Sequence, residues 1–386
     1  MSKTTQRKAV IVGAGIAGLA AARRLSEIGW EVVVAEKAPE RRGGGYLLAL
    51  TGLGYQSADR MGLLAALSAR ALNPVEFRYA NAAGRFGYCV PGDTMRAVLG
   101  QDAVILFRGD IESVLYDAIP GNVDLQFGQT VDEITQDDTG VQVTLASGGT
   151  LTADLLIAAD GLHSATRRQV FGPEKGFRRD LGHMLAATTL HEPPDGIPDG
   201  TVSTFTAVGR TATIANLGPD HRAAFFDYTT NDTQSELGKT AFAALATPYE
   251  DFRTVIPDVL TQLPTSATTY FDTVSQLVID RWTDNRVVLL GDAAWCVSLF
   301  AGYGASLALA GADQLATALD QQDIPTALRT WETKLRPETT ASQRRGSRNA
   351  RLHAPTNRLR LLARDLSMRA TVFPPVRQLI RHQLRA

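Results

Sequence analysis

The stretch KAVIVGAGIAG, residues 8–18, decides the fold that we expect of this chain. Its first five residues are mostly apolar and rich in β-branched side chains, which is typical of a buried parallel strand. Gly13, Gly15 and Gly18 follow at once in the pattern GxGxxG, and residues 19–29 then predict a helix. Together these features predict the first unit of a nucleotide-binding α/β fold.

Each glycine of this turn has its own expected role. Gly13 permits the tight turn, Gly15 lets the backbone approach a pyrophosphate, and Gly18 allows the helix to pack closely on the strand. The backbone amides of Ile16 and Ala17 lie at the start of the helix, where they face negative phosphates. A glycine-rich turn without a ligand is the weaker alternative, because strand, turn and helix occur in the right order.

An acidic residue follows at the position that a dinucleotide site needs. Residues 31–35 predict a second strand, and Glu36 at its end lies eighteen positions beyond Gly18. A carboxylate there accepts hydrogen bonds from an adenosine ribose. Because it would repel a 2′-phosphate, the pattern indicates FAD or NAD rather than NADP.

Length and composition fit a multi-domain globular protein. The chain has 386 residues, of which 44% are hydrophobic and 20% charged, so global disorder is excluded. Its 39 basic and 40 acidic residues leave no whole-molecule field for nucleic acid or membrane. Residues 337–386 nevertheless hold 11 Arg against Glu338 and Asp365, a net charge of +9. We interpret this basic tail as a solvated helical cap.

Cysteine and histidine usage points to no metal centre and no disulfide framework. The two cysteines, Cys89 and Cys296, cannot build either alone, and the six histidines show no ligand or triad spacing. The uncharged stretches 9–22 and 293–312 fit a strand-turn-helix and a buried loop with a helix better than a signal peptide or a membrane span. A reduced, cytoplasmic enzyme is the simplest expectation.

The pattern of apolar and polar residues along the chain changes at two places. From about residue 178, alternating apolar and polar residues predict antiparallel strands, and a buried strand returns at 287–290. From 326 onward the pattern is helical, with breaks expected at Pro337, Pro355 and Pro374–Pro375. We expect a discontinuous nucleotide domain (1–72, 96–177 and 275–325), a mostly antiparallel sheet domain (73–95 and 178–274) and a helical C-terminal segment (326–386).

Three further motifs follow the glycine turn in order. Arg108-Gly109-Asp110 precedes a predicted helix, Asp160-Gly161 ends a buried strand, and Gly291-Asp292 ends another within VVLLGDAAWCVSLFAGYG. With these motifs the chain resembles, over nearly its whole length, the aromatic-hydroxylase-like FAD monooxygenases. These are single-component, class A flavoprotein hydroxylases with the glutathione-reductase-type Rossmann fold.

The resemblance implies a reaction. Non-covalent FAD would be reduced by NAD(P)H, which binds transiently in a groove because no second dinucleotide fold is visible. Oxygen would then form a flavin C4a-hydroperoxide that hydroxylates an aromatic or polycyclic small molecule, a chemistry that belongs to the cofactor. We therefore assign no catalytic side chain, expect no nucleic-acid or membrane partner, and leave open whether the protein is a monomer or a homodimer.

The resemblance also assigns cofactor contacts. Asp292 would bind the ribityl chain or the phosphate-side hydroxyls of FAD, Arg108 would contact FAD, and Asp160 would bridge the FAD and nicotinamide sites. The simpler alternatives are a strand-end cap for Asp292 and a surface ion pair for Arg108. The remaining expected contacts are Arg41 or Arg42 near the adenosine, and Gly291, Gly302, Gly304 and Ala305 before and within a helix start that faces the flavin.

Two residues depart from the family pattern. Trp295 stands where His or Tyr is common, and Leu299 replaces a proline on the flavin face where oxygen reacts. They keep open an FAD-binding protein without net oxygenation, a scaffold or cyclase-like role in secondary metabolism. A flavin halogenase is disfavoured because the Trp-x-Trp-x-Ile-Pro signature is missing. Cys296 is expected to be a buried apolar cysteine rather than a covalent flavin anchor.

Aromatic residues of the antiparallel sheet are the candidates for a substrate pocket. Phe205, Phe225 and Tyr228 lie in predicted strands, and Tyr46 or Tyr303 would lie near the flavin ring. For each of them, membership of the ordinary core is the plainer interpretation. The scarcity of polar groups on these strands indicates an apolar, bulky aromatic substrate such as a polyketide.

Overall fold

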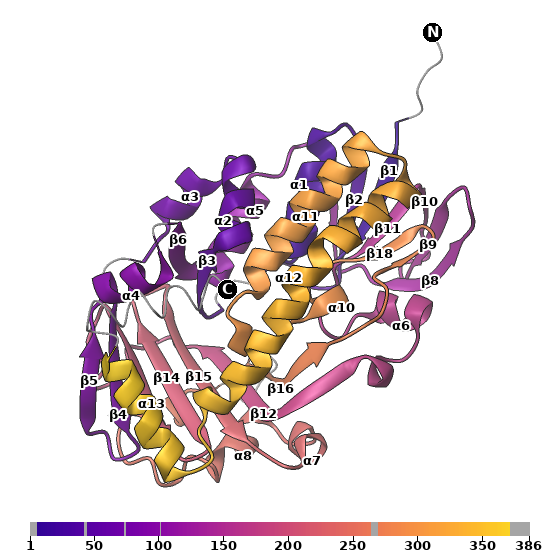
Figure 1. The fold of residues 1–386 in the computed structure, drawn as a ribbon. Helices are drawn as coiled ribbons and strands as arrows, with labels where there is room; N and C mark the ends of the chain where they lie inside the picture. Colours follow the sequence, from indigo (N-terminus) through magenta and orange to yellow (C-terminus); the bar gives the residue numbers. More distant parts are fainter. Residues whose placement is uncertain (1–5, 42–44, 73–74, 101, 264–268, 371–386) are drawn as a thin grey trace.

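Two β-sheets and a long bridging helix organise the protein. The computed structural model describes residues 6–41, 45–72, 75–100, 102–263 and 269–370. A parallel sheet with its helices fills the upper half of Figure 1, and a larger antiparallel sheet fills the lower half. This is the α/β architecture, with an inserted antiparallel sheet and C-terminal helices, that the sequence predicts.

The glycine turn belongs to a six-stranded sheet whose neighbouring strands are parallel except for one edge pair. Its strand order is β17 (Thr283–Asp284), β18 (Val287–Leu289), β11 (Leu155–Ala158), β1 (Lys8–Val12), β2 (Glu31–Glu36) and β7 (Asp124–Phe127), with β17 antiparallel to β18. Such strands are apolar on both faces because both faces are covered. Helices α1 (Ile16–Glu27) and α11 (Gly304–Gln321) pack on one face. The small sheet of β8 (Val131–Gln136), β9 (Val141–Leu145) and β10 (Thr150–Ala153) packs on the other.

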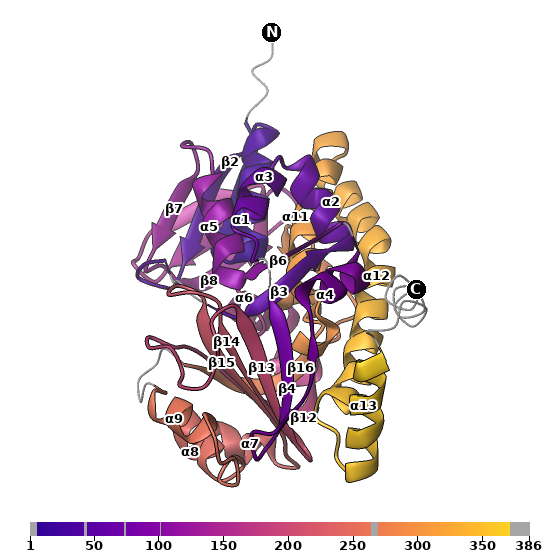
Figure 2. The same ribbon diagram turned by 90° about the vertical axis from the view of Figure 1, so that its left-hand side faces the viewer.

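The second large sheet is antiparallel apart from the pairing of β4 with β13. Its order is β16 (Tyr270–Leu277), β12 (Arg178–Thr189), β15 (Arg222–Thr229), β14 (Arg210–Asn216), β13 (Thr201–Ala207), β4 (Glu76–Asn81) and β5 (Phe86–Val90). Helices α7 (Thr233–Leu237), α8 (Ala241–Ala246) and α9 (Ile256–Thr261) lie by it, and Figure 2 shows α8 and α9 on the side away from the C-terminal helices. Strand β16 crosses the predicted domain boundary at residue 274.

Shorter elements connect the two halves. Strands β3 (Leu47–Thr51) and β6 (Ala103–Phe107) form a two-stranded sheet that the sequence analysis did not predict. The remaining short helices are α2 (Gly52–Arg60), α3 (Leu64–Ala69), α4 (Gly92–Leu99), α5 (Arg108–Asp117), α6 (Ala165–Phe171) and α10 (Asp292–Trp295).

The helix α12 (Ile324–His353) corrects one expectation, because it continues through Pro337. A proline removes one hydrogen bond inside a helix, but Leu335 and Thr339, on either side of it, are buried and hold the helix in place. The expected break at Pro355 is confirmed, since α12 ends before it and α13 (Arg358–Ala370) begins after it. Pro374–Pro375 lie outside the described residues.

The length of α12 lets it touch both halves of the molecule, as Figure 1 shows. Trp331 donates a hydrogen bond to the carbonyl of Gly311 in the upper half, and the carbonyl of His353 accepts one from Thr211 in the antiparallel sheet. Among the described residues, no helix combines the length and apolar character that crossing a membrane requires.

Candidate functional site

Two glycines of the first turn are required by the protein's own packing. Gly13 has φ +101°, and a Cβ there would lie 2.5 Å from the carbonyl oxygen of Ala159. A Cβ on Gly18 would lie 1.9 Å from the carbonyl oxygen of Gly13. Neither contact can be relieved by rotating a side chain, so both positions demand glycine for the turn itself.

Gly15 is different, because nothing in the protein requires a glycine there. Its φ of −79° is ordinary for any residue. The nearest atoms to a Cβ would be Arg108 Nη2 and Glu112 Oε1, both 3.8 Å away. The space beside Gly15 is therefore open, as a closely approaching phosphate requires.

Glu36 is fixed at the end of β2 by two backbone amides. Its Oε2 accepts a hydrogen bond from the amide of Ala14 at 2.7 Å, and its Oε1 accepts one from the amide of Ala38 at 2.8 Å. An ionised carboxylate has about four acceptor positions. Glu36 therefore lies beside the glycine turn with acceptor capacity left for ribose hydroxyls.

Arg108 begins α5 next to the open space at Gly15. Its guanidinium pairs with Glu112 at 2.7 Å, yet 42% of its side chain stays exposed. Burial opposes its positive charge, but the charges of Glu112 and Tyr46 outweigh this and raise its pKa. The ion pair that was the simpler alternative for Arg108 is therefore present. It leaves part of the Arg108 guanidinium exposed to an anionic ligand.

The motif of Gly291 and Asp292 meets the glycine turn directly. Gly291 has φ +65°, and a Cβ there would lie 2.8 Å from the Cβ of Ala17. The following Asp292 is exposed, although burial raises the pKa of its carboxyl against the opposing effect of Arg108. These two facts indicate a carboxylate that faces accessible but poorly solvated space.

Asp292 has acceptor capacity that the protein does not use. Among the described residues its side chain is bonded only by the thiol of Cys296, a weak donor. A Cβ on Gly304 would lie 4.0 Å from Asp292 Oδ1, so the start of α11 lies beside this carboxylate. A carboxylate with open acceptor positions fits a ligand rich in hydroxyl groups, such as the ribityl chain of FAD.

The other expected cofactor residues have different surroundings. Asp160 accepts hydrogen bonds from the Oγ of Ser164, the residue that caps α6, and, at 3.1 Å, from the amide of Thr166 in the first turn of that helix. Its proposed contact with nicotinamide stays a prediction. Gly302 has φ +61° with open space around it, and Ala305 packs in the first turn of α11.

Of the two arginines expected near the adenosine, Arg42 lies outside the described residues. The Arg41 guanidinium lies over the ring of Tyr116, 4.1 Å from its centroid, and 3.9 Å from the carboxylate of Asp117.

The five pocket candidates separate into two groups. Tyr46 and Phe225 meet with ring centroids 6.0 Å apart, and the charges of Arg108 and Asp292 act on the Tyr46 hydroxyl, whose pKa burial raises. These two rings therefore lie beside the candidate cofactor site.

The other three candidates pack into the protein. Phe205 and Tyr228 are buried in the core beneath α8 and α9, and the Tyr228 hydroxyl donates to Glu236. The Tyr303 hydroxyl accepts the amide of Leu53 at 2.9 Å. Their placement matches the plainer interpretation of sheet aromatics as core.

The sequence analysis missed Tyr270 and its partners. Tyr270 begins β16, is 49% exposed, and its hydroxyl donates to Asp272 at 3.3 Å. Asp272 also pairs with Nε2 of His163 at 2.6 Å. Burial raises the pKa of Tyr270, and the charges of Asp272 and Tyr46 add to this effect. The alternating pattern YFDTVSQL at 270–277 was the available signal for this strand.

Trp295 faces the core. Its ring lies 4.8 Å from that of Trp282 and 6.0 Å from that of Trp331, and a Cβ on Gly311 would lie 2.7 Å from it. Leu299 packs with Phe225 in an apolar cluster. Cys296 is buried, and burial raises its pKa well above the ordinary value, as expected of an apolar cysteine.

The fold and the glycine turn with Glu36 are those of a dinucleotide-binding α/β protein. Residues 6–322 match the model of a family described as "FAD binding domain". An uncharacterized protein of Mycobacterium tuberculosis is 33% identical over 80% of this chain and 84% of its own length. A flavin-dependent monooxygenase from an unknown prokaryotic organism is 30% identical over 83% of this chain and 82% of its own. The solved structure of the tetracycline destructase Tet(51) is 27% identical, with a TM-score of 0.84 and 98% of both chains covered.

The chain belongs to the aromatic-hydroxylase-like family of FAD-dependent monooxygenases. The predicted family, fold, cofactor FAD and enzyme class are thereby confirmed. The residues that would hold FAD are a prediction supported by the open space at Gly15 and by the acceptor positions of Glu36 and Asp292.

Proposed function

We propose that this monooxygenase hydroxylates a bulky, largely apolar aromatic or polycyclic small molecule with NAD(P)H and O2. The observation that carries the proposal is the contact between Tyr46 and Phe225 beside Asp292 and Arg108. It puts an aromatic surface of the antiparallel sheet next to the residues that fit the cofactor. FAD, when bound, would supply the redox chemistry between NAD(P)H and O2.

The chain's own residues would bind and orient the cofactor. Backbone amides at the start of α1 face the pyrophosphate, Glu36 accepts ribose hydroxyls, and Asp292 accepts hydroxyls of the ribityl chain. Arg108 adds positive charge beside Gly15. The N-terminal end of α11, beside Asp292, adds the positive end of a helix dipole, which favours negative charge on a reduced flavin.

The substrate side would be apolar. Phe225 packs against a cluster of buried apolar side chains at the same face of the sheet, which comprises Leu185, Val274, Phe300 and Ala350 with Leu181 and Leu299. Aromatic rings in such surroundings bind best to other rings, edge-on or offset. The likeness to a protein named a tetracycline destructase supports a polycyclic substrate.

The alternative of a flavoprotein without net oxygenation rested on Trp295 and Leu299. Trp295 is engaged in a tryptophan cluster of the core, so its identity has a packing reason. We therefore retain the hydroxylase. We also propose a cytoplasmic location, supported by two free thiols, Cys89 and Cys296, and a monomer or homodimer that needs no nucleic acid or membrane.

The experiment is a substrate screen with product analysis. Purified protein loaded with FAD is mixed with NADH or NADPH and a panel of aromatics, and oxidation is followed at the nicotinamide absorbance. We expect bulky neutral polycycles to stimulate oxidation and to gain one oxygen atom from ¹⁸O₂. Stimulation by small charged aromatic acids alone, or hydrogen peroxide without oxygenated product, would contradict the proposal.

A further inference from the structure

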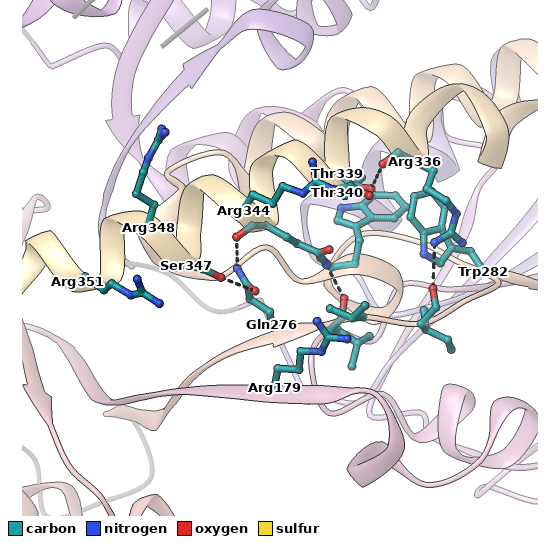
Figure 3. Close-up of a pocket in the computed structure, with 15 residues that line it drawn as sticks. Arg179, Gln276, Trp282, Arg336, Thr339, Thr340, Arg344, Ser347, Arg348 and Arg351 are labelled. Carbon is teal, nitrogen blue, oxygen red and sulfur yellow. Dashed lines mark hydrogen bonds between the residues drawn. The ribbon is translucent and has the colours of Figure 1, made fainter. Parts of the chain in front are cut away.

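A second cleft lies between α12 and the neighbouring strands β12 and β16. Figure 3 shows the residues that line this cleft, which lies between α12 and the end of β16. Its volume is about 520 Å³. Arginines provide its charged lining, and no Asp or Glu belongs to that lining. The five are Arg179 from β12 and Arg336, Arg344, Arg348 and Arg351 from α12.

Among the described residues, most of this positive charge has no acidic partner. Arg336 pairs with Glu332. The other four arginines are exposed and form no ion pair within the described part of the chain. Asp180, next to Arg179 in sequence, already pairs with Arg178, and Glu338 of α12 pairs with Arg345. Four guanidinium groups therefore remain available to an anion.

The polar floor of the cleft is fixed and needs no ligand. Gln276 Nε2 donates to the carbonyls of Val297 and Gln343, at 3.1 and 2.6 Å, and Ser347 Oγ donates to Gln276 Oε1 at 3.0 Å. Gln343 Nε2 donates to the carbonyls of Leu277 and Trp295. The side chains of Gln276, Gln343 and Ser347 are thus held by the protein's own hydrogen bonds, and the charged donors of the cleft belong to the arginines.

The spacing of the cleft arginines favours a ligand that carries several negative groups. Arg344, Arg348 and Arg351 occupy positions i, i+4 and i+7 of α12, so they share one helix face and span about 10 Å. Arg179 lies on the other side of the cleft (Figure 3). Each phosphate group carries a charge of about −1.5 to −2, so two phosphates balance four guanidinium groups. Arginine is also the side chain that best binds phosphate with paired hydrogen bonds.

We propose that this cleft binds a small molecule that carries two or more phosphate groups, such as the diphosphate of a nucleotide. Its volume falls within the range of about 300–1,000 Å³ that is usual for small-molecule sites. None of the residues that fit FAD lines the cleft. The site is therefore separate from the cofactor site and does not depend on the proposed hydroxylation.

The test measures binding of inorganic pyrophosphate to the full-length, FAD-loaded protein by isothermal titration calorimetry at low salt. The double variant Arg344→Gln/Arg348→Gln should bind at least about tenfold more weakly, because two charge-assisted contacts are lost. The control Arg329→Gln alters an exposed arginine of the same helix that does not line the cleft, and should bind like the wild type. Equal flavin absorbance and melting temperature establish that each variant is folded.

Binding of other ligands distinguishes which kind of phosphate-bearing molecule the cleft takes. Orthophosphate should bind more weakly than pyrophosphate, and equal affinity would overturn the need for two phosphates. Similar affinities for ADP and NADPH would indicate a free nucleotide, whereas much tighter binding of NADPH would indicate the coenzyme, and both support the site. No binding of pyrophosphate, or equal binding by the double variant, overturns it. Tighter binding of single-stranded DNA, weakened equally by Arg329→Gln, would instead identify a nucleic-acid surface.

Discussion

The ring of Tyr46 meets the ring of Phe225 edge-on, with their centroids 6.0 Å apart and their planes at 64°. Tyr46 directly precedes β3 in the nucleotide half, whereas Phe225 lies in the middle of β15. The contact joins the two halves at the point where the charges of Arg108 and Asp292, two candidate cofactor residues, act on Tyr46. An aromatic substrate that reaches the flavin would therefore meet these rings.

Replacing Phe225 by Ala should weaken substrate binding more than cofactor binding. Aromatic pairs contribute about 0.5–1.5 kcal/mol beyond area burial, so we expect the KM for the substrate to rise between about twofold and tenfold. The flavin absorbance should stay unchanged. Steady-state NAD(P)H oxidation with the substrate found in the screen provides the measurement.

The matched control for this change is Phe205→Leu. Phe205 is 1% exposed on the opposite face of the same sheet, so its replacement should lower the melting temperature and leave KM unchanged. A KM that rises equally in both variants would show that Phe225 acts only through stability.

Gly18→Ala should destabilise the apoprotein, whereas Gly15→Ala in the same turn should weaken FAD binding. Gly18→Ala puts a Cβ 1.9 Å from a backbone oxygen, and we expect destabilisation of about 3 kcal/mol or more. Gly15→Ala meets no atom closer than 3.8 Å, so the apoprotein should stay within about 1 kcal/mol of the wild type. Its FAD affinity should nevertheless fall at least tenfold, because the methyl group occupies the path of the pyrophosphate.

Urea unfolding of the apoproteins and FAD titration followed by flavin fluorescence separate the two effects. Normal FAD affinity in Gly15→Ala would show that the open space at this turn does not accommodate the cofactor.

Removing the charge of Asp292 should weaken FAD binding without harming the apoprotein. Burial raises the pKa of this carboxyl, so the folded apoprotein holds its charge at a cost. Asp292→Asn should therefore leave the free energy of unfolding of the apoprotein unchanged or raise it. The loss of a charged acceptor should weaken FAD binding by about 10- to 100-fold.

Asp132→Asn, an exposed change in β8, serves as the control and should affect neither quantity. A strand-end cap, the simpler role considered for Asp292, predicts the reverse: lower apoprotein stability with FAD affinity intact.

Local patterns predicted the parts of the site that one segment builds. The glycine turn, the strand before it and Glu36 at the end of β2 depend on residues within about thirty positions, where period and turn chemistry determine structure. The break before α13 followed in the same way from Pro355.

Features made by distant segments could not be predicted in this way. The arginine cleft brings Arg179 of β12 next to α12, a helix far away in sequence, and only the tertiary fold determines that approach. Pro337 was expected to end a helix, but buried neighbours override its local preference. Trp295 fits the position because Gly311 leaves room for its ring, a relation that neither residue reveals alone.

The ion pair of His163 with Asp272 should make stability depend on pH in a defined direction. Hydrogen bonding to Asp272 raises the pKa of His163 above 6.5 in the folded state, against the opposing effect of burial. A raised folded pKa means that the stabilisation is fully present below pH 6.5 and is lost as the pH rises through the folded pKa. His163→Asn should therefore lower the melting temperature at pH 5.5 and have little effect near pH 9. Because His163 is 51% exposed, the largest difference should stay below about 1 kcal/mol.

The titration of His353 changes stability with pH in the opposite direction. This effect is the same in the wild type and in His163→Asn, so it cancels when the two are compared. Burial lowers the pKa of His353, so its contribution to stability is fully present above pH 6.5 and is lost as the pH falls through the lowered folded pKa, equally in wild type and variant. His191→Asn is the control, because His191 is exposed and forms no ion pair among the described residues. Thermal unfolding of the three proteins between pH 5.5 and 9 gives the differences. A difference between wild type and His163→Asn that grows with pH, or that His191→Asn reproduces, would contradict the assignment of the effect to the pair between His163 and Asp272.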